Sequence, residues 1–558
     1  MSPLASRKER PWWRDAVTYQ IYPRSYADSN GDGIGDVEGI RSRLPYLKQL
    51  GIDAIWISPW YPSPQHDHGY DVADYMDIEP DYGTLAQAET LIKEANDLGI
   101  KLIVDIVPNH TSSDHTWFQA ALKAGPGSPE RNRYMFREGK GPNGDLPPNN
   151  WEAVFGGCAW ERVIEADGKP GQWYLHLFAV EQPDLNWENP EVVAHLEDVL
   201  KFWLDRGVAG FRIDVAHGMF KEKGLPDIRK DPAASMLGTE HKPFWDQEGV
   251  HDIYRSWRKI LDSYPGDRMA VAEAWVSPSE RIARYVRSDE LQNSFNFEML
   301  TTLWDAKEIK TKINNSIDAL EEVGAPTSWV FNNHDVVRSV DRLDLGLTNH
   351  GDTTLSRQGD PKKLNIARGT LRARSAALMT LALPGGTYLY QGEELAVPEV
   401  RDIPEDRLTD PRWKMSGFSD RGRDGCRVPM PWTSNPAGAF GFSTNASLKP
   451  EQAWLPQSPW WGTYAVDTQD GVEGSTLSMY RKALAIRKGE EGLGDGPMEW
   501  IEAGKDVVAF ERPGDFACYI NFGAPIELPS NSQVLVSSGP ITGHTLPTDT
   551  AAWVRLVS

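Results

Sequence analysis

The sequence predicts an α/β protein: a (β/α)8 TIM barrel with a loop-rich subdomain inserted after strand 3 and a C-terminal antiparallel β domain. Three observations predict this fold. Amphipathic segments that end at glycine are repeatedly followed by apolar, β-rich runs. Eight such runs can be counted along the chain. Near the C-terminus the pattern changes to short strands separated by turn residues.

The repeating unit is clearest in three segments: "LPYLKQLGIDAIWIS" (44–58), "LIKEANDLGIKLIVDIV" (91–107) and "LKFWLDRGVAGFRIDV" (200–215). Glycine just past a helix permits the left-handed conformation that ends it. The apolar runs that follow are typical of parallel strands buried on both faces. Alternation of helix and strand implies right-handed βαβ units and a parallel sheet.

The eight expected strands are 17–25, 52–58, 101–107, 210–215, 269–274, 293–297, 327–332 and 386–391. A bare barrel needs about 250 residues, so this chain of 558 residues must carry insertions. We expect the barrel in 1–108 and 181–490, an inserted subdomain rich in Gly, Pro and Asn in 109–180, and a long loop excursion at about 392–465. Residues 491–558 form the β domain, in which "DVVAFERPGDFACYINFG" reads as two strands joined by a Pro-Gly-Asp turn.

The composition restricts the possible partners. The formal net charge of −22 disfavours nucleic acid and anionic membranes and favours neutral or cationic ligands, or a divalent metal. The three cysteines, Cys158, Cys426 and Cys518, form no CxxC pair, so neither a disulfide framework nor a zinc site is expected. No signal-peptide core and no long apolar run are seen. We expect a cytoplasmic protein without nucleic-acid or membrane partners and leave its oligomeric state open.

Polar residues recur where the expected barrel strands end, which is where barrel enzymes place their active sites. These residues are Asp105, Asn109 and His110 in "DIVPNH", Arg212 and Asp214 in "GFRIDVAH", Glu273 in "AEAW", and His334 and Asp335 in "NNHD". One carboxylate at a strand end is more often a turn or a helix cap. The same rim position on four strands favours a functional site.

Two facing carboxylates suit glycoside hydrolysis, in which one attacks the sugar and the other protonates the leaving oxygen. Arg212 lies two residues before Asp214, so both side chains share one face of a strand. A guanidinium there keeps a carboxylate ionised and nucleophilic. The acid must hold its proton near neutral pH, which requires burial beside other carboxylates. We therefore expect Asp214 as nucleophile and Glu273 as acid/base.

These four motifs, in this order, resemble the signature regions of the α-amylase superfamily (glycoside hydrolase family 13). "QPDLNW" (182–187) resembles the fifth region of its oligo-1,6-glucosidase/α-glucosidase branch, and the resemblance covers nearly the whole chain. It implies a retaining double displacement through a β-glucosyl-enzyme on Asp214. Glu273 then matches the general acid/base, and Asp335 matches the carboxylate that stabilises the transition state.

The resemblance also implies a set of substrate-binding residues. His110 and His334 match ligands of hydroxyls on the −1 sugar, and Arg212 matches the arginine beside the nucleophile. Asp67 and Tyr70 in "HDHGYD" match the pair that holds the terminal glucose. Arg427 in "RDGCRVPMPW" matches the arginine that pairs with that aspartate and closes the pocket. The remaining matches, at the −1 and +1 sites, are Phe155, Phe178 and Gln182; both phenylalanines could instead be packing residues of the subdomain.

A closed pocket implies an exo-acting α-glucosidase for short α-glucosides and oligosaccharides. The alternative is an α-glucosyltransferase or a sucrose/maltose isomerase on the same scaffold. Val215 after the nucleophile resembles α-1,6-acting members, whereas the loop "EVRDIPEDRLTDPRWKMSG" (399–417) resembles broader α-glucosidases that prefer α-1,4 links or sucrose. The linkage therefore stays open. Non-catalytic transporter subunits of the superfamily lack catalytic carboxylates, and phosphosugar hydrolases need a basic cradle, so neither alternative is favoured.

The loop "YADSNGDGIGD" (26–36) places oxygen-bearing side chains at alternate positions, as at the start of an EF-hand loop. Its twelfth position is Gly39 rather than the bidentate Glu of an EF-hand, so a true EF-hand is not expected. Relatives in the branch carry one Ca²⁺ or Mg²⁺ in this loop. The resemblance implies the ligands Asp28, Asn30, Asp32, the Ile34 carbonyl and Asp36, and no organic cofactor.

Overall fold

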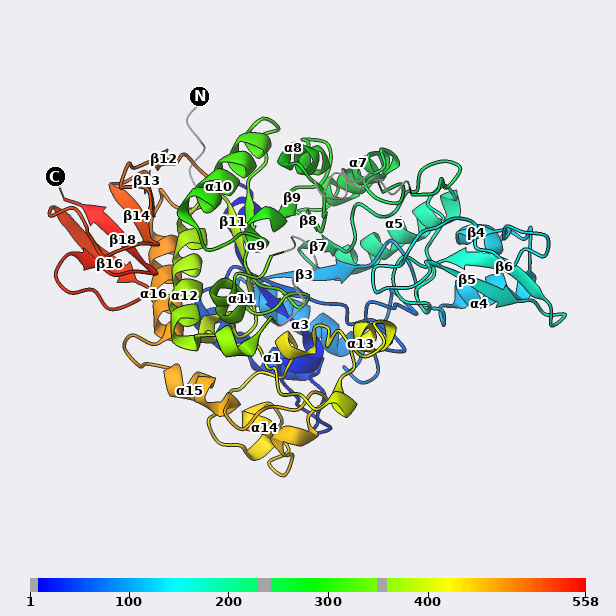
Figure 1. Cartoon of the computed structure of the whole chain (residues 1–558), viewed down its shortest axis with the longest axis horizontal. Helices are drawn as coiled ribbons and strands as arrows, with labels where there is room; N and C mark the ends of the chain where they lie inside the picture. Colours follow the sequence, from blue (N-terminus) through cyan, green and yellow to red (C-terminus); the bar gives the residue numbers. More distant parts are fainter. Residues whose placement is uncertain (1–8, 229–241, 349–358, 558) are drawn as a thin grey trace.

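The computed structural model describes residues 9–228, 242–348 and 359–557. Its centre is a closed barrel of parallel strands in the order β1-β11-β10-β9-β8-β7-β3-β2 (Figure 1). The strands are β1 (Val17–Ile21), β2 (Ala54–Ile57), β3 (Lys101–Ile106), β7 (Gly210–Ile213), β8 (Met269–Ala272), β9 (Asn293–Asn296), β10 (Ser328–Val330) and β11 (Gly386–Tyr390). All eight expected strands are confirmed. The first ends at Ile21 rather than residue 25, because a 3₁₀ turn begins at Pro23.

Side chains from opposite strands fill the barrel. Trp56 of β2 lies 5.5 Å from Phe295 of β9, and Phe295 lies 4.8 Å from Tyr388 of β11, between ring centroids. Since β2 and β9 are not neighbours in the sheet, the first contact crosses the barrel interior. The packed interior leaves the carboxyl ends of the strands as the place for a site.

Helices surround the barrel, as seen in Figure 1. Asn189 caps α5 by accepting a hydrogen bond from the Glu191 amide, and α2 ends at Gly51, whose φ of 96° is left-handed. The helices are α1 (Val37–Ser42), α2 (Leu44–Leu50), α3 (Leu85–Asp97), α4 (Thr116–Ala124), α5 (Pro190–Asp205), α7 (Gly249–Asp262), α8 (Ser279–Ala283), α9 (Phe297–Leu300), α10 (Ala306–Glu321), α11 (Ser339–Leu345), α12 (Ile366–Ala382), α13 (Pro411–Met415), α14 (Ala437–Gly441), α15 (Val466–Gln469) and α16 (Thr476–Gly489).

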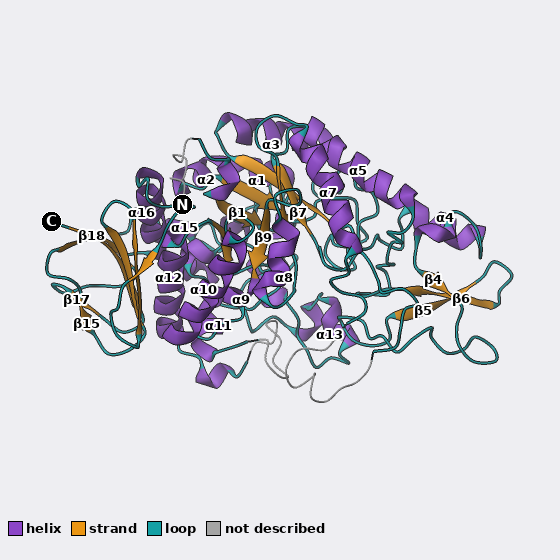
Figure 2. Cartoon of the chain, turned by 90° about the horizontal axis from the view of Figure 1, so that it is seen from above, coloured by secondary structure: helices purple, strands orange, loops and turns teal. Residues whose placement is uncertain are grey.

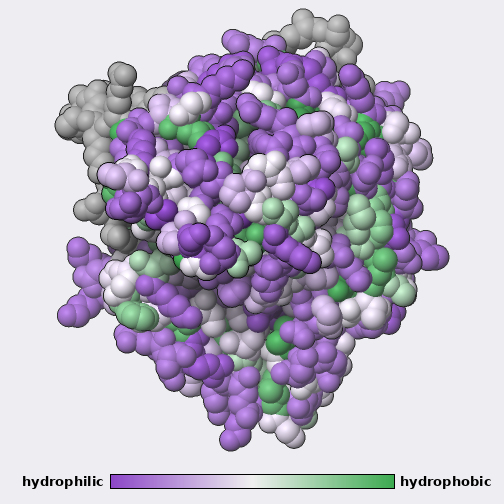
Figure 3. Space-filling model, turned by 90° about the vertical axis from the view of Figure 1, so that its right-hand side faces the viewer, coloured by the Kyte–Doolittle hydropathy of each residue, from purple (hydrophilic) through white to green (hydrophobic). Residues whose placement is uncertain are grey.

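The subdomain after β3 contains α4 and a small antiparallel sheet in the order β4-β6-β5. These strands are β4 (Phe136–Arg137), β5 (Trp160–Ile164) and β6 (Pro170–Leu175). The sheet lies at the opposite end of the molecule from the C-terminal strands (Figure 2). The face at this end is largely hydrophilic with small hydrophobic patches (Figure 3).

The C-terminal sheet is antiparallel, in the order β12-β13-β14-β18-β16, with a separate pair β15-β17. Its strands are β12 (Glu499–Trp500), β13 (Val507–Arg512), β14 (Phe516–Asn521), β15 (Ile526–Glu527), β16 (Ser532–Ser537), β17 (Thr545–Leu546) and β18 (Thr550–Leu556). The expected hairpin is confirmed as β13-β14. Trp553 of β18 packs on α12 and donates to the Leu378 carbonyl at 2.9 Å.

The residue boundaries expected for the two parts of the barrel, the inserted subdomain and the C-terminal domain remain predictions. None of the helices in the described ranges combines the length and apolar character needed to cross a membrane.

Candidate active site

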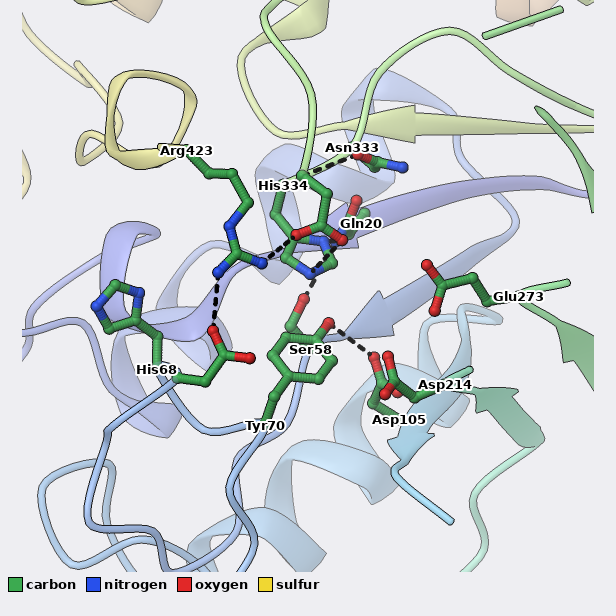
Figure 4. A network of polar contacts seen from close by, with 12 residues as sticks. Gln20, Ser58, His68, Tyr70, Asp105, Asp214, Glu273, Asn333, His334 and Arg423 are labelled. Atoms are coloured by element: carbon green, nitrogen blue, oxygen red, sulfur yellow. Dashed lines mark hydrogen bonds and ion pairs between the residues drawn. The ribbon is translucent and has the colours of Figure 1, made fainter. Parts of the chain in front are cut away.

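A cavity of about 920 Å³ opens where the barrel strands end. It is lined by nine of the residues predicted from sequence: Asp67, Tyr70, His110, Phe155, Phe178, Asp214, Glu273, His334 and Asp335. Figure 4 shows Tyr70, Asp214, Glu273 and His334 turned toward a common space. Three other predicted residues, Gln182, Arg212 and Arg427, lie behind this wall and contact the lining residues.

Arg212 connects three carboxylates from neighbouring strands. Its Nη1 lies 2.6 Å from Asp214 Oδ1 and 3.0 Å from Asp105 Oδ1, and its Nη2 lies 2.6 Å from Glu273 Oε2. The side chain is 2 % exposed, so these contacts are made away from water. The fork of the guanidinium suits this arrangement, because separate nitrogens reach separate oxygens. The predicted pairing with Asp214 is present, but Arg212 also holds Glu273 and Asp105.

The acidic groups influence one another strongly. Burial raises the pKa of Asp214 well above its usual value, and Glu273 and Asp105 raise it further, whereas Arg212 lowers it. Burial likewise raises the pKa of Asp105 to about 7 against the effect of Arg212. Arg212 therefore acts on Asp214 in the expected direction, but burial and two neighbouring carboxylates oppose it. The contact between Asp214 and Glu273 thus favours the protonated form of Asp214, and Arg212 favours the ionised form.

His334 and Asp335 form the opposite wall. Gln20 Nε2 donates to His334 Nδ1 at 2.7 Å, so the ring carries its proton on Nε2, which lies 3.3 Å from Asp335 Oδ2. The His334 ring stacks on Tyr70, with centroids 5.1 Å apart (Figure 4). Burial opposes ionisation of Asp335, but His334, Arg423 and Arg427 outweigh it and hold its pKa well below the usual range. Asp335 is thus an anion that faces the cavity.

The ion pair with Asp67 is made by Arg423 and not by Arg427, which corrects the prediction. Arg423 Nη2 lies 2.8 Å from Asp67 Oδ1, its Nη1 lies 2.9 Å from Asp335 Oδ1, and its Nε lies 2.6 Å from Asp410 Oδ2. Arg427 instead donates to the His334 carbonyl at 2.8 Å and reaches Asp335 at 3.0 Å. The 3₁₀ turn Asp424–Cys426 separates the two arginines and directs them to different partners.

The remaining predicted residues form one chain of contacts. Tyr70 Oη donates to Asp105 Oδ2 at 3.2 Å, and His110 Nε2 lies 3.1 Å from the Tyr70 carbonyl. Gln182 Nε2 lies 3.0 Å from the same His110 nitrogen and donates to Asp67 Oδ2 at 3.2 Å. The Phe178 ring lies 5.2 Å from His110 and 5.7 Å from Phe155. Both phenylalanines therefore line the cavity as well as pack in the subdomain.

Sequence reasoning assigned no role to several lining residues. Trp275 stacks on Phe297 with centroids 4.0 Å apart, and its Nε1 donates to Glu273 Oε1 at 3.2 Å. His217 also lines the cavity. Both residues lie inside the motifs "AEAW" and "GFRIDVAH", so the signal was present but unassigned. Arg423 lies four residues before Arg427, and no feature of the local sequence separates the two.

The aspartate loop follows β1 and is braced by its own side chains. Asp28 Oδ1 accepts from the Gly31 amide at 2.6 Å and Oδ2 accepts from the Gly33 amide at 2.8 Å. Asp36 caps α1 by accepting from the Gly39 amide at 2.6 Å. Among the described residues, no group of three or more His, Cys, Asp or Glu is placed to hold a metal ion. The Ca²⁺ prediction therefore stays a prediction.

The family model described as "Alpha amylase, catalytic domain" matches residues 20–496. A probable α-glucosidase of Rhizobium meliloti is 36 % identical over 96 % of this chain and 93 % of its own. An oligo-1,6-glucosidase of Parageobacillus thermoglucosidasius is 37 % identical over 86 % and 84 %. The crystal structure of the α-glucosyl transfer enzyme XgtA superposes with a TM-score of 0.84 at 33 % identity, covering 98 % of this chain and 100 % of that one.

The matches span most of the chain, and the barrel carries the acidic rim that the motifs predicted. The chain therefore belongs to the α-amylase family of glycoside hydrolases, in its oligo-1,6-glucosidase/α-glucosidase branch.

Proposed function

We propose that the protein is a retaining, exo-acting α-glucosidase that releases α-glucose from the non-reducing end of short α-glucosides and oligosaccharides. One observation carries the proposal: Asp214 and Glu273 share a cavity with the Asp67–Arg423–Asp335 ion-pair network. These charged groups can hydrogen-bond to the hydroxyls of one terminal sugar, which places the leaving group on the side of Glu273. The names of the relatives support the same substrate class.

The reaction proceeds in two steps. Asp214 attacks the anomeric carbon while the glycosidic bond breaks, and Glu273 gives its proton to the leaving oxygen. Water then attacks the same carbon, Glu273 takes its proton, and Asp214 is released from the β-glucosyl-enzyme. Arg212 stabilises Asp214 as it regains its charge, because the two side chains are in direct contact. Asp335 holds sugar hydroxyls and stabilises the positive charge of the transition state.

Transfer to a sugar or alcohol is the alternative second step. It uses the same glucosyl-enzyme with another hydroxyl in place of water. The similarity to XgtA, which is described as an α-glucosyl transfer enzyme, supports transfer as the second candidate activity. Product analysis on maltose and sucrose, with and without added acceptor, separates the two. Glucose as nearly the sole product at high acceptor concentration contradicts transfer.

For the aspartate loop we infer a single Ca²⁺ or Mg²⁺ with a structural role. Asp28 and Asp32 each accept hydrogen bonds from loop amides, and carboxylate oxygens keep further lone pairs for a cation. Asn30, the Ile34 carbonyl and Asp36 complete an all-oxygen donor set. Such an ion braces the loop after β1 and takes no part in bond cleavage.

The direct test is a substrate panel with detection of the released anomer. Maltose, isomaltose, sucrose, trehalose, kojibiose and an aryl α-glucoside are each offered, and the first glucose formed is followed by NMR. α-Glucose as the initial product is expected for a retaining enzyme. β-Glucose as the initial product, or cleavage within long chains but not at their ends, contradicts the proposal. The panel also decides the linkage that the sequence leaves open.

A further inference from the structure

Arg338 is a buried arginine beside the catalytic rim that the mechanism above does not use. It lies three residues after Asp335, at the N-terminal cap of α11, and is 3 % exposed. Its Nη1 donates to the Gln391 carbonyl at 3.0 Å, and its Nη2 donates to the Cys426 carbonyl at 2.8 Å. Its backbone amide donates to Glu399 Oε2 at 3.0 Å. One residue thus joins the segment of Asp335 to three points of the chain that follows β11.

The Cys426 carbonyl is held from two sides. Besides Arg338, the Tyr390 hydroxyl donates to it at 3.0 Å. The guanidinium of Arg338 also lies over the Tyr390 ring, 4.9 Å from its centroid. A carbonyl oxygen has two lone pairs, and here each has a donor. The end of the 3₁₀ turn Asp424–Cys426 is therefore fixed in place.

This turn separates the two arginines of the pocket. Arg423 precedes it and Arg427 follows it, and both contact the same oxygen, Asp335 Oδ1, at 2.9 and 3.0 Å. The contacts close a ring. From Asp335 the chain leads to Arg338, which holds the Cys426 carbonyl. The next residue is Arg427, which returns to Asp335. A shift of the turn would therefore move two cations relative to the anion that faces the cavity.

We propose that Arg338 is a positioning residue of the site: by holding the Cys426 carbonyl, it sets where the two pocket arginines meet Asp335. This inference rests on the proposed α-glucosidase function and deepens it, because Asp335 is the carboxylate assigned to the sugar hydroxyls and the transition state. Arg338 itself does not line the cavity in the described part of the chain, so it acts through the turn. A displacement of about 1 Å in a group that positions the substrate can lower the rate by about 100-fold.

Arg338→Lys tests the fork of the guanidinium while it keeps the positive charge. A lysine ammonium cannot donate to two carbonyls in the fixed geometry of an arginine. The matched control is Arg512→Lys in β13. Arg512 is also 3 % exposed and donates to three backbone carbonyls. These belong to Ala382, Gly494 and Pro497, and none of the three lines the described cavity.

The measurement is kcat/KM for the best substrate of the panel, together with the melting temperature. We expect Arg338→Lys to lower kcat/KM by about 10- to 100-fold, whereas Arg512→Lys should stay within about twofold of wild type. Both variants should melt below the wild type, because each loses buried hydrogen bonds. An unchanged kcat/KM in Arg338→Lys, or an equal loss in Arg512→Lys, overturns the proposal.

A double-mutant cycle separates positioning from a general loss of packing. Arg338→Lys is made both in the wild-type enzyme and in Arg427→Lys. If Arg338 acts through the arginines beside the turn, its replacement should cost at least about threefold less in the second background. Equal fold losses in the two backgrounds mean independent effects and contradict the positioning role.

Tyr390→Phe tests the same carbonyl with a change that preserves shape, and it decides the matter if Arg338→Lys does not fold. It removes one neutral hydrogen bond to Cys426 and should lower kcat/KM by about 3- to 10-fold. No change in kcat/KM would refute the role of this carbonyl. If the wild-type enzyme cleaves no α-glucoside at all, the proposed function fails instead, which is distinct from an active enzyme that is insensitive to these substitutions.

Discussion

Arg423 is the residue on which the geometry of the terminal-glucose pocket depends, and Arg423→Lys tests this directly. Three different nitrogens of Arg423 contact Asp410, Asp335 and Asp67, and its side chain is 7 % exposed. A lysine ammonium is a single point charge and cannot span three carboxylates. Loss of two charge-assisted hydrogen bonds at about 1.5 kcal/mol each gives about 3 kcal/mol. We expect kcat/KM for an aryl α-glucoside to fall by about 100-fold.

A double-mutant cycle shows which arginine is coupled to Asp67. Arg423→Lys and Arg427→Lys are each combined with Asp67→Asn, and the coupling is calculated from kcat/KM. We expect a coupling of about 1 kcal/mol or more between positions 423 and 67, because these side chains are in contact. Positions 427 and 67 should couple by less than about 0.5 kcal/mol. The reverse order of the two couplings would refute the assignment of Arg423 as the partner of Asp67.

Four further predictions follow from the same structure. Asp214→Asn should lower turnover by at least about 1,000-fold while circular dichroism stays native, and wild-type rates would contradict its role as nucleophile. Glu273→Gln should lose about 100- to 10,000-fold on maltose but much less in the first step with an activated aryl glucoside; equal losses would contradict its role as acid. A chelator should lower the melting temperature by about 3 °C or more if loop 26–36 holds an ion, and no shift counts against a tight site. Burial raises the pKa of Glu399 to about 8 from an ordinary value of 4.5, so its contribution to stability is complete below about pH 4.5 and is lost as the pH rises to about 8. Glu399→Gln should therefore raise the melting temperature at about pH 8.5 but not at about pH 4, whereas the exposed control Glu322→Gln should change it at neither pH. Equal shifts for Glu399→Gln at both pH values would contradict this reasoning.

The barrel was predictable because each of its units has a local signature. A helix that ends at a glycine and an apolar strand are both encoded within about 15 residues, as in 44–58 with Gly51 at the helix end. Once each strand is located, the residues at its carboxyl end are located as well. The positions of Asp214, Glu273 and Asp335 at one rim could therefore be inferred before their distances were known.

The contacts between loops were not predictable in the same way. Arg423 and Arg427 are chemically identical and four residues apart, in a loop far along the chain from Asp67. Which of them reaches Asp67 depends on a short 3₁₀ turn and on Asp410, which holds Arg423 from behind. The contact between Arg212 and Glu273 was also not predictable, because it joins residues from two different strands.

The sequence by itself determined the order of barrel strands, the rim on which the acidic residues lie and the family of the chain, because these depend on periodicity and on short motifs. Only the tertiary structure decided which charges meet and how burial and neighbouring carboxylates shift the pKa of Asp214. The reason is physical. The energy of a charge or a buried polar atom depends on its neighbours in space, and those neighbours come from segments far apart in the chain.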